Sequence, residues 1–328
     1  MPQKRLNIVA VDPNGKRRPI PQSTRHARRL ETQAKFDRMW LVDPEQFNPL
    51  RNAMERERLD RTFAAIKEHF DPVYKLVADL GCGSGVMSRR IRDAGASIHA
   101  VDISNNALKI LAQSDMTSIQ ATQDYVPRTT LTDESYDLVI STELIAWLPS
   151  DDYRLYMAEL ARLVKGEGWV VCSTAVDIDS EDALQRFAAL AETEFTVKKW
   201  ILSYHRLSLR LWDFFDAPRR FFRASQDPEY REQQLKKRHA FSLLWFRCNS
   251  SKILGYFWFL IQYIATPIAY ALKQWPPLLN GMEKISRFLW NDAGITHAIF
   301  IAKRRPLIPP PPEDELPIEP KGKRQVWE

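Results

Sequence analysis

Residues 76–85 read Leu-Val-Ala-Asp-Leu-Gly-Cys-Gly-Ser-Gly, an apolar strand that runs directly into a glycine-rich turn. A helical segment follows the turn. Glycines at such a position let the backbone turn tightly and approach a ligand closely. The next apolar segment ends at Asp102, about twenty residues after Gly81, which is the spacing of a carboxylate that binds ribose hydroxyl groups. This stretch therefore predicts an α/β fold with a site for a nucleotide-like ligand.

Outward from this turn, short strands alternate with helices as far as about Leu202. Such alternation predicts a parallel sheet with helices on both faces. The expected strands are 76–80, 97–102, 118–121, 136–141, 169–173 and 195–202. A seventh strand, 296–302, follows only after roughly ninety residues. Connections in compact domains usually have roughly two to six residues, so a substructure must be inserted before the last strand.

The chain divides into four parts by composition. They are a basic, mostly disordered arm (1–30), the ligand-binding domain (31–202 with 294–305), a helical insertion (203–293) and a Pro-rich disordered tail (306–328). Ten basic residues against three acidic ones lie between Met1 and Arg38. Such an arm can bind nucleic acid or an anionic membrane surface, or it can simply be solvated.

The glycine turn suits either a dinucleotide or S-adenosylmethionine. A dinucleotide fingerprint, Gly-x-Gly-x-x-Gly, requires glycine at position 86. That residue is Val86, and the third glycine comes one residue earlier, at Gly85. A dinucleotide also places its pyrophosphate on the helix N-terminus, whereas S-adenosylmethionine has no phosphate. The pattern therefore favours S-adenosylmethionine.

Five segments together resemble the signature motifs of class I, Rossmann-like, S-adenosylmethionine-dependent methyltransferases. They are 77–85, Val101-Asp102, Asp124, 136–141 and 163–168. The resemblance covers about 53–202 and the last strand, and it is closest to the small-molecule and quinone-precursor methyltransferases. It implies a doubly wound sheet of seven strands, six parallel and the last antiparallel, with the insertion between strands 6 and 7.

The resemblance also implies S-adenosyl-L-methionine as the cofactor and a role for each acidic residue. Asp79 is expected near the methionine amino group, Asp102 at the ribose hydroxyl groups, and Asp124 at the exocyclic amine of adenine. The other expected cofactor contacts are Gly81, Cys82, Gly83, Gly85, Ile103, Tyr125, Ser141 and Thr142. We expect no metal, because the three cysteines are widely spaced, and their spacing also indicates a reducing compartment.

Two residues are candidates for catalysis, Glu143 and His205. Related enzymes often have a Glu-x-x-x-His run after the fourth strand, but here Trp147 stands where His is common, as a core residue or a pocket wall. His205 follows the sixth strand, whose carboxyl end lies at the cofactor edge. An imidazole titrates near neutral pH, so His205 is a candidate general base, with a structural role as the alternative.

The insertion is rich in aromatic residues, and residues 253–272 are almost uncharged. As a helix this run would be roughly 30 Å long, enough to cross a bilayer core. Gln262, Pro267 and the need for a second crossing argue against a span. We expect a monotopic or re-entrant contact with the bilayer. A helix buried in the protein as a lid and a true span are the alternatives.

The sequence thus predicts methyl transfer, with O-methylation favoured, to a small lipophilic acceptor or lipid. The expected location is cytoplasmic, peripheral or monotopic at the membrane. A nucleic-acid methyltransferase is one alternative because of the basic arm, but no Asn-Pro-Pro-Tyr-like run or Pro-Cys nucleophile is present, so nucleic acid is not the expected partner. A non-catalytic cofactor-binding or membrane-associated protein is the other alternative.

Overall fold

A seven-stranded sheet organises the fold in the order β5-β4-β3-β6-β7-β9-β8. The computed structural model describes residues 9–11, 17–19, 22–114, 118–176, 182–236 and 240–306, with side chains from residue 27 onward except at 240 and 241. The strands are β3 (Leu76–Leu80), β4 (Ser97–Asp102), β5 (Ile119–Gln123), β6 (Tyr136–Thr142), β7 (Val164–Ala175), β8 (Phe195–Ser203) and β9 (His297–Arg304).

Six strands are parallel, and β9 pairs antiparallel with both β7 and β8. The predicted fold class is therefore confirmed. Strand β7 starts earlier than the predicted 169–173, and its pairing with β6 shifts register between Tyr136 and Leu138. The strand order reverses between β3 and β6, and ligands of open α/β sheets bind at this switch point.

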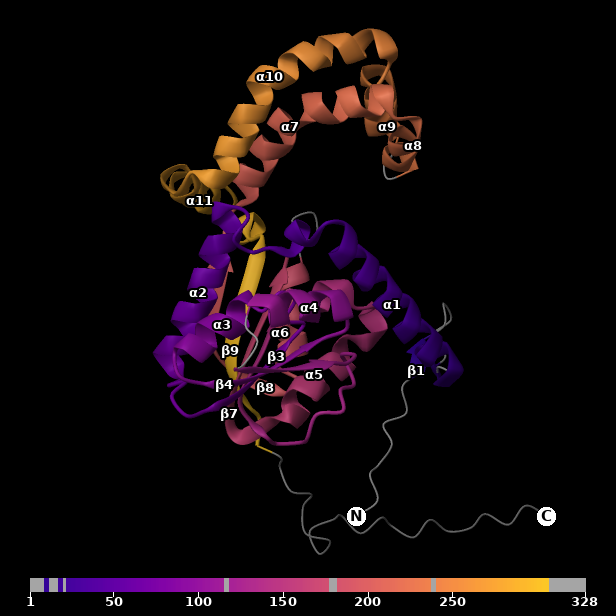
Figure 1. The fold of residues 1–328 in the computed structure, drawn as a ribbon. Helices are drawn as coiled ribbons and strands as arrows, with labels where there is room; N and C mark the ends of the chain where they lie inside the picture. Colours follow the sequence, from indigo (N-terminus) through magenta and orange to yellow (C-terminus); the bar gives the residue numbers. More distant parts are fainter. Residues whose placement is uncertain are drawn as a thin grey trace, which may run out of the picture.

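Helices cover both faces of the sheet (Figure 1). They are α2 (Ala53–His69), α3 (Val86–Asp93), α4 (Asn105–Ser114), α5 (Tyr153–Leu163) and α6 (Ala183–Ala191). Helices α2, α3 and α4 pack on one face through Ile66, Ile91 and Leu111, and α5 and α6 pack on the other through Tyr156 and Phe187. Burial on both faces explains why the central strands are nearly continuous apolar runs.

The N-terminal region contributes a long helix, α1 (Gln22–Val42), which crosses the arm boundary predicted at residue 30. Asp37 anchors α1 to the domain, because its Oδ1 accepts a hydrogen bond from Ser104 Oγ at 2.8 Å and its backbone oxygen accepts one from Asn106 Nδ2 at 2.9 Å. Tertiary contacts, which composition does not reveal, thus extend the domain toward the N-terminus.

Two short strands, β1 (Val9–Val11) and β2 (Arg17–Pro19), pair before α1. They fall within the arm that was predicted to be mostly disordered. The other residues before position 22 lie outside the described part of the chain. The predicted tail, 306–328, lies outside it too, apart from its first residue.

The insertion forms helices that extend away from the sheet edge (Figure 1). They are α7 (Arg206–Gln226), α8 (Pro228–Lys236), α9 (Ala240–Asn249), α10 (Lys252–Gln274) and α11 (Pro276–Trp290). Helices α7 and α10 run side by side, with α8 and α9 at their far end and α11 returning to β9. A Cβ on Gly255 would lie 2.3 Å from Ser225 Oγ, so glycine permits the close approach of the two long helices.

Candidate functional site

The turn after β3 has the backbone conformation that its glycines predict. Gly81, Gly83 and Gly85 have φ angles of 73°, 54° and 77°, in the left-handed region that favours glycine. A Cβ at Gly85 would also lie 2.2 Å from Leu111 Cδ1. The turn therefore requires glycine for both conformation and space, and it leaves its backbone open toward a cavity.

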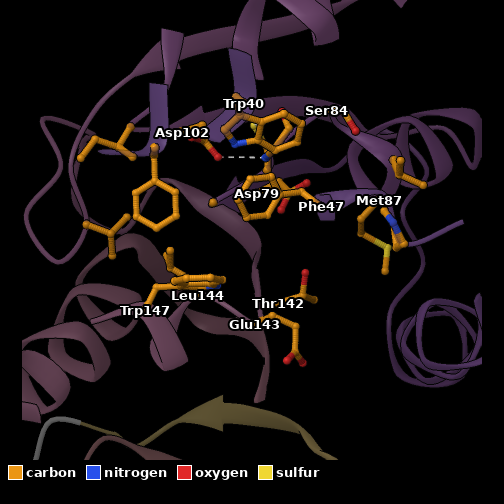
Figure 2. A pocket seen from close by; sticks show the side chains of 18 of the residues that line it. Trp40, Phe47, Asp79, Ser84, Met87, Asp102, Thr142, Glu143, Leu144 and Trp147 are labelled. Atoms are coloured by element: carbon orange, nitrogen blue, oxygen red, sulfur yellow. Dashed lines mark hydrogen bonds between the residues drawn. The ribbon is translucent and has the colours of Figure 1, made fainter. Parts of the chain in front are cut away.

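Asp102 ends β4 directly beside this turn and is only 8% exposed. Its Oδ2 accepts a hydrogen bond from the Gly83 N–H at 2.9 Å (Figure 2). Its Oδ1 accepts one from the Ser104 N–H at 2.8 Å. Burial raises the pKa of Asp102 to about 6, against these hydrogen bonds. The carboxylate is thus held in one orientation at the edge of the cavity.

Asp79 lies at the end of β3 and lines the same cavity. The pKa of Asp79 is raised to about 6. Burial is the main cause and the nearby charge of Asp102 adds to it, while a hydrogen bond from Ser88 opposes the shift. Among the described residues neither acid has a basic partner within 4 Å. Two buried carboxylates without cations fit a ligand that carries ammonium and sulfonium charges and two ribose hydroxyl groups, as S-adenosylmethionine does.

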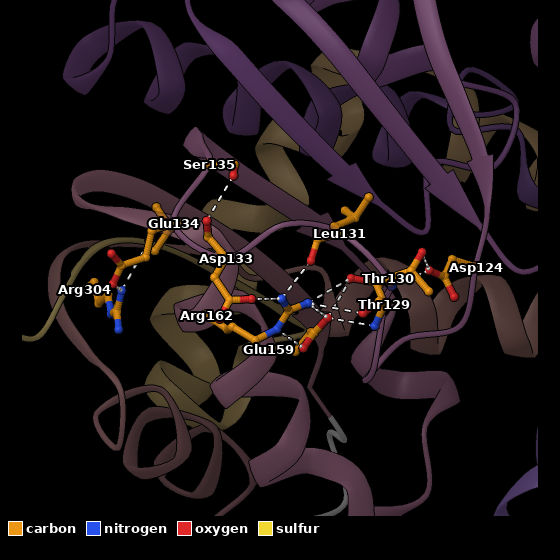
Figure 3. Close-up of polar contacts among 11 residues, drawn as sticks. Asp124, Thr129, Thr130, Leu131, Asp133, Glu134, Ser135, Glu159, Arg162 and Arg304 are labelled. Atoms are coloured by element: carbon orange, nitrogen blue, oxygen red, sulfur yellow. Dashed lines mark hydrogen bonds and ion pairs between the residues drawn. The ribbon is translucent and has the colours of Figure 1, made fainter. Parts of the chain in front are cut away.

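Asp124 lines the cavity but already binds the turn that follows it (Figure 3). Its Oδ1 accepts the Tyr125 N–H at 2.7 Å, and its Oδ2 accepts Thr130 Oγ1 at 2.8 Å. Arg29 of α1 approaches it at 3.5 Å. Arg162 holds the next part of this loop through Glu159 and backbone oxygens. Asp124 therefore organises the loop, and its contact with adenine stays a prediction.

Some of the remaining predicted cofactor contacts line the cavity, and others do not. Cys82, Ile103, Tyr125 and Thr142 line the cavity together with Gly81 and Gly83, whereas Gly85 does not line it. Ser141 does not line it: this side chain is fully buried and donates a hydrogen bond to Leu80 O at 3.1 Å. The expectation that Ser141 closes over the methionine moiety is therefore corrected, because strand alternation turns its hydroxyl into the sheet.

Three aromatic side chains that the sequence did not identify, Phe36, Trp40 and Phe47, line the cavity beside Trp147, and Figure 2 shows Trp40, Phe47 and Trp147 around it. Trp40 stacks on Phe47 with ring centroids 4.7 Å apart, and Phe36 meets Trp147 edge-on at 5.4 Å. Trp147 is 45% exposed and lines the cavity wall, so it is not a core residue. The available signal was the spacing of Phe36 and Trp40, which puts both rings on one face of a helix.

Glu143 lies at the wall that the cofactor cavity shares with a second cavity. It has a φ of 60°, uncommon for a non-glycine residue and frequent at functional sites. Its Oε1 accepts a hydrogen bond from Ser173 Oγ at 2.9 Å and pairs with Arg58 at 3.1 Å. His297 Nε2 lies 3.9 Å from its Oε2. A carboxylate, a guanidinium and an imidazole therefore meet at this wall.

His297, at the start of β9, was not identified from the sequence. The pKa of His297 is lowered to about 4, mainly by burial. The charge of Arg58 contributes to this lowering, and the charge of Glu55 opposes it. Burial therefore disfavours the protonated imidazole, and a proton taken up by His297 would need the nearby Glu143 carboxylate to stabilise it. The sequence offered no local signal, because α2, β6 and β9 bring Arg58, Glu143 and His297 together from distant parts of the chain.

His205, the predicted general base, lines neither of the two cavities. It is 2% exposed at the start of α7, with Nε2 3.8 Å from Glu57 Oε2. Burial lowers its pKa, while Glu283 and Glu57 raise it. The prediction of a catalytic His205 is thus corrected: α7 starts immediately after β8 and α11 packs against it, so the imidazole is enclosed between the insertion and α2.

The second cavity lies between the domain and the base of the insertion, and both it and the cofactor cavity are open to solvent; with the adjoining solvent space included, they measure about 1890 Å³ and about 1230 Å³. The two cavities share Phe47, Pro49, Arg58, Glu143 and Trp147. On the insertion side the second cavity is lined by Trp212, Asp216, Arg219, Thr266, Ala269, Tyr270, Lys273 and Gln274. A bulky molecule in it can thus reach the cofactor cavity.

Comparisons with known proteins agree with this geometry. Residues 78–172 match a family described as a methyltransferase domain. The ubiquinone biosynthesis O-methyltransferase of Nitrosomonas europaea is 30% identical over 152 residues, 44% of this chain and 61% of that protein. The malonyl-[acyl-carrier protein] O-methyltransferase of Pseudescherichia vulneris is 34% identical over 140 residues, 38% of this chain and 53% of that protein. The chain thus spans between half and two thirds of the length of these relatives.

Among solved structures, the magnesium protoporphyrin IX methyltransferase of Synechocystis PCC 6803 with bound SAM has a TM-score of 0.42 and 18% identity, over 52% of this chain and 89% of that one. Strand order, the glycine turn with Asp102, and the family match define a Rossmann-like nucleotide-binding domain. More narrowly, residues 78–172 form a methyltransferase domain with the class I sheet, and S-adenosyl-L-methionine is the cofactor of this class.

Proposed function

We propose that the protein transfers a methyl group from S-adenosylmethionine to an oxygen atom of a small lipophilic acceptor at a membrane surface. The observation that carries this proposal is the second cavity. It adjoins the cofactor cavity at Glu143 and is closed on its other side by α7 and α10. The O-methyltransferases among the relatives support oxygen as the acceptor atom.

The cofactor supplies a methyl group that its sulfonium charge already activates. The chain's own residues align the acceptor and exclude water. In the proposed mechanism the acceptor hydroxyl lies at the shared wall and gives its proton to the neutral His297. Glu143 then stabilises the imidazolium, while Arg58 and Ser173 hold the carboxylate in position.

The outer face of α10 supports the membrane location. Its buried residues, among them Gly255, Ala265 and Ala269, face α7. The opposite stripe is exposed and apolar, and consists of Ile253, Tyr256, Phe257, Leu260, Tyr263, Ile264 and Ile268. Leu260 alone is 67% exposed. A contiguous apolar face of this kind marks an interaction surface.

Charge identifies the proposed partner of this face as an anionic bilayer. Residues 203–295 contain fourteen Lys and Arg against seven Asp and Glu. Among the described residues α10 is the one helix long and apolar enough to cross a membrane. Its base returns to the sheet edge through α11, so we propose that α10 lies in the interface with its apolar stripe in the lipid.

The proposal is tested by S-adenosylhomocysteine formation with lipid-soluble catechols, in the presence and absence of phosphatidylglycerol vesicles. We expect turnover that increases when the acceptor is delivered in vesicles. Turnover of RNA or DNA in place of catechols would contradict it. Cofactor binding without turnover of any fraction of a cell extract would instead favour a non-catalytic role.

A further inference from the structure

The second cavity contains a lysine that no acidic group neutralises. Lys273, near the end of α10, places its Nζ 3.5 Å from the centroid of the Trp212 ring. Among the described residues no carboxylate lies within 4 Å of this amine, and it makes no hydrogen bond. A desolvated ammonium on an indole face is stabilised in part by the ring, but it lacks a counter-ion.

The other charges of the cavity are mostly paired. Arg219 donates to Asp216 at 2.7 and 3.2 Å, and Arg58 pairs with Glu55 at 2.6 Å as well as with Glu143. Arg51 is the exception, since within the described residues its guanidinium has no acidic partner. Among the described residues, the exposed Arg51 and the half-buried Lys273 are therefore the two Lys or Arg side chains of this cavity without an acidic partner within 4 Å.

A hydrogen bond of Gln274 connects the two chain segments that carry Arg51 and Lys273. Gln274, the neighbour of Lys273, donates a hydrogen bond through Nε2 to the Arg51 backbone oxygen at 2.7 Å and accepts one from Arg56 at 3.3 Å. Burial lowers the pKa of Lys273, Asp216 and Glu55 raise it, and the charge of Arg51 lowers it again. The two cations thus repel each other, and a bound anion would remove that repulsion.

We propose that Lys273 and Arg51 bind one anionic group of the methyl acceptor, a carboxylate or a phosphate. Trp212 and Tyr270, which line the same wall, pack on the adjacent apolar part. The assignment rests on the proposed function, in which this cavity holds the acceptor. The acceptor is then an amphiphile with a hydroxyl group at Glu143 and His297 and an anion at the α10 wall.

Calorimetry on the full chain loaded with S-adenosylhomocysteine tests the site with three probes: 3,4-dihydroxybenzoate, its methyl ester and inorganic phosphate. The wild-type protein should bind the acid at least about tenfold more tightly than the ester, since a charge-assisted hydrogen bond is lost in the ester. Lys273→Gln should remove that preference and Lys273→Arg should keep most of it. Lys236→Gln, on the exposed surface of α8, is the matched control and should change nothing.

Three results would overturn the site. They are equal binding of acid and ester by the wild type, a preference that survives Lys273→Gln, and phosphate binding as tight as that of the acid, which would indicate a free-anion site. Loss of flotation with phosphatidylglycerol vesicles in Lys273→Gln would assign the lysine to lipid headgroups and also contradict the proposal. If the acid binds in a way that depends on Lys273 but no S-adenosylhomocysteine forms, the proposed function is contradicted. The anion site at Lys273 is supported in that case.

Discussion

The sheet and the insertion both contain long apolar runs, but they use them differently. In β3 the side chains of Val77, Ala78 and Leu80 are completely buried, because helices cover both faces of the sheet. In α10 a narrow side with Gly255 and Ala265 is buried, and the opposite side carries exposed apolar side chains such as Leu260. Apolar composition alone therefore does not distinguish a core from an interface; the number of covered faces does.

The charge balance of the two regions differs as well. The insertion has a clear excess of basic residues, whereas the sheet region places two acids, Asp79 and Asp102, beside a glycine turn, and no described residue gives them a cationic partner. We interpret the first region as complementary to an anionic surface and the second as complementary to a cationic cofactor. Variants in one region should therefore leave the function of the other intact.

The largest effect is expected at the wall between the cavities. His297→Ala should reduce kcat on the order of 10²- to 10⁴-fold, the usual contribution of a positioned general base, with unchanged cofactor affinity. The measurement is S-adenosylhomocysteine release at saturating acceptor, beside calorimetry with S-adenosylhomocysteine. The control is His205→Gln, which should retain kcat. A kcat within twofold of wild type in His297→Ala would reject the proposed base.

The next effect is on the cofactor site alone. Asp102→Asn should weaken S-adenosylmethionine binding by about 1.5–3 kcal/mol, the range for hydrogen bonds to charged groups. Vesicle flotation should not change. Calorimetry measures the affinity, and wild-type binding by the variant would rule out the ribose assignment.

The raised pKa of Asp102 also predicts how the stability of the folded protein depends on pH. Its pKa in the folded protein is about 6, above the ordinary value of 3.8. The folded state therefore binds more protons than the unfolded state between these values, and this group's stability contribution is lost as pH rises through 6. Asp102→Asn removes this ionisation, although its amide nitrogen replaces one of the two acceptor oxygens. The fall in Tm of the cofactor-free protein between pH 5 and pH 7.5 should therefore be smaller in the variant than in wild type. Differential scanning calorimetry at both pH values measures the two changes, and an equal or larger fall in the variant would contradict the prediction.

A fourth prediction tests the exposed stripe of α10. Replacing Tyr256, Leu260 and Ile264 together by Glu should abolish flotation with phosphatidylglycerol vesicles and preserve cofactor affinity. Phe259 is unsuitable, because its ring packs 5.0 Å from that of Phe222 and a charge there would disturb the helix pair. Leu41→Glu, at an exposed site on α1, is the control. A wild-type dimer that the triple variant dissociates would assign the stripe to a second copy of the chain.

The smallest effect is expected at the N-terminus. Removal of residues 1–21 leaves α1 intact and should change cofactor affinity and turnover less than twofold. Removal of residues 1–30 cuts into α1 and deletes Arg29, so it should weaken cofactor binding. Tight RNA or DNA binding with a steep salt dependence, abolished by the shorter deletion, would instead support the nucleic-acid alternative.

Sequence by itself determined the fold class, the glycine turn and the place of Asp102. These features are local, because each depends on residues that are close in the sequence. They are an apolar strand, a turn that only glycine tolerates, and a carboxylate at the end of the next strand. Seven strands in the predicted directions followed from the alternation of strand and helix, together with the family resemblance. The position of the insertion before β9 could be predicted from the number of residues between the sixth and the seventh strand alone.

Tertiary structure alone decided which polar groups meet. Arg58, Glu143 and His297 are separated by long stretches of chain. They meet at one wall because β7 pairs with β6 on one side and β9 on the other, and α2 packs on the sheet beside them. The same packing encloses His205, which the sequence placed at the cofactor edge. Strand ends can be predicted from short-range patterns, but burial and side-chain partners depend on contacts between distant segments, and no local pattern records them.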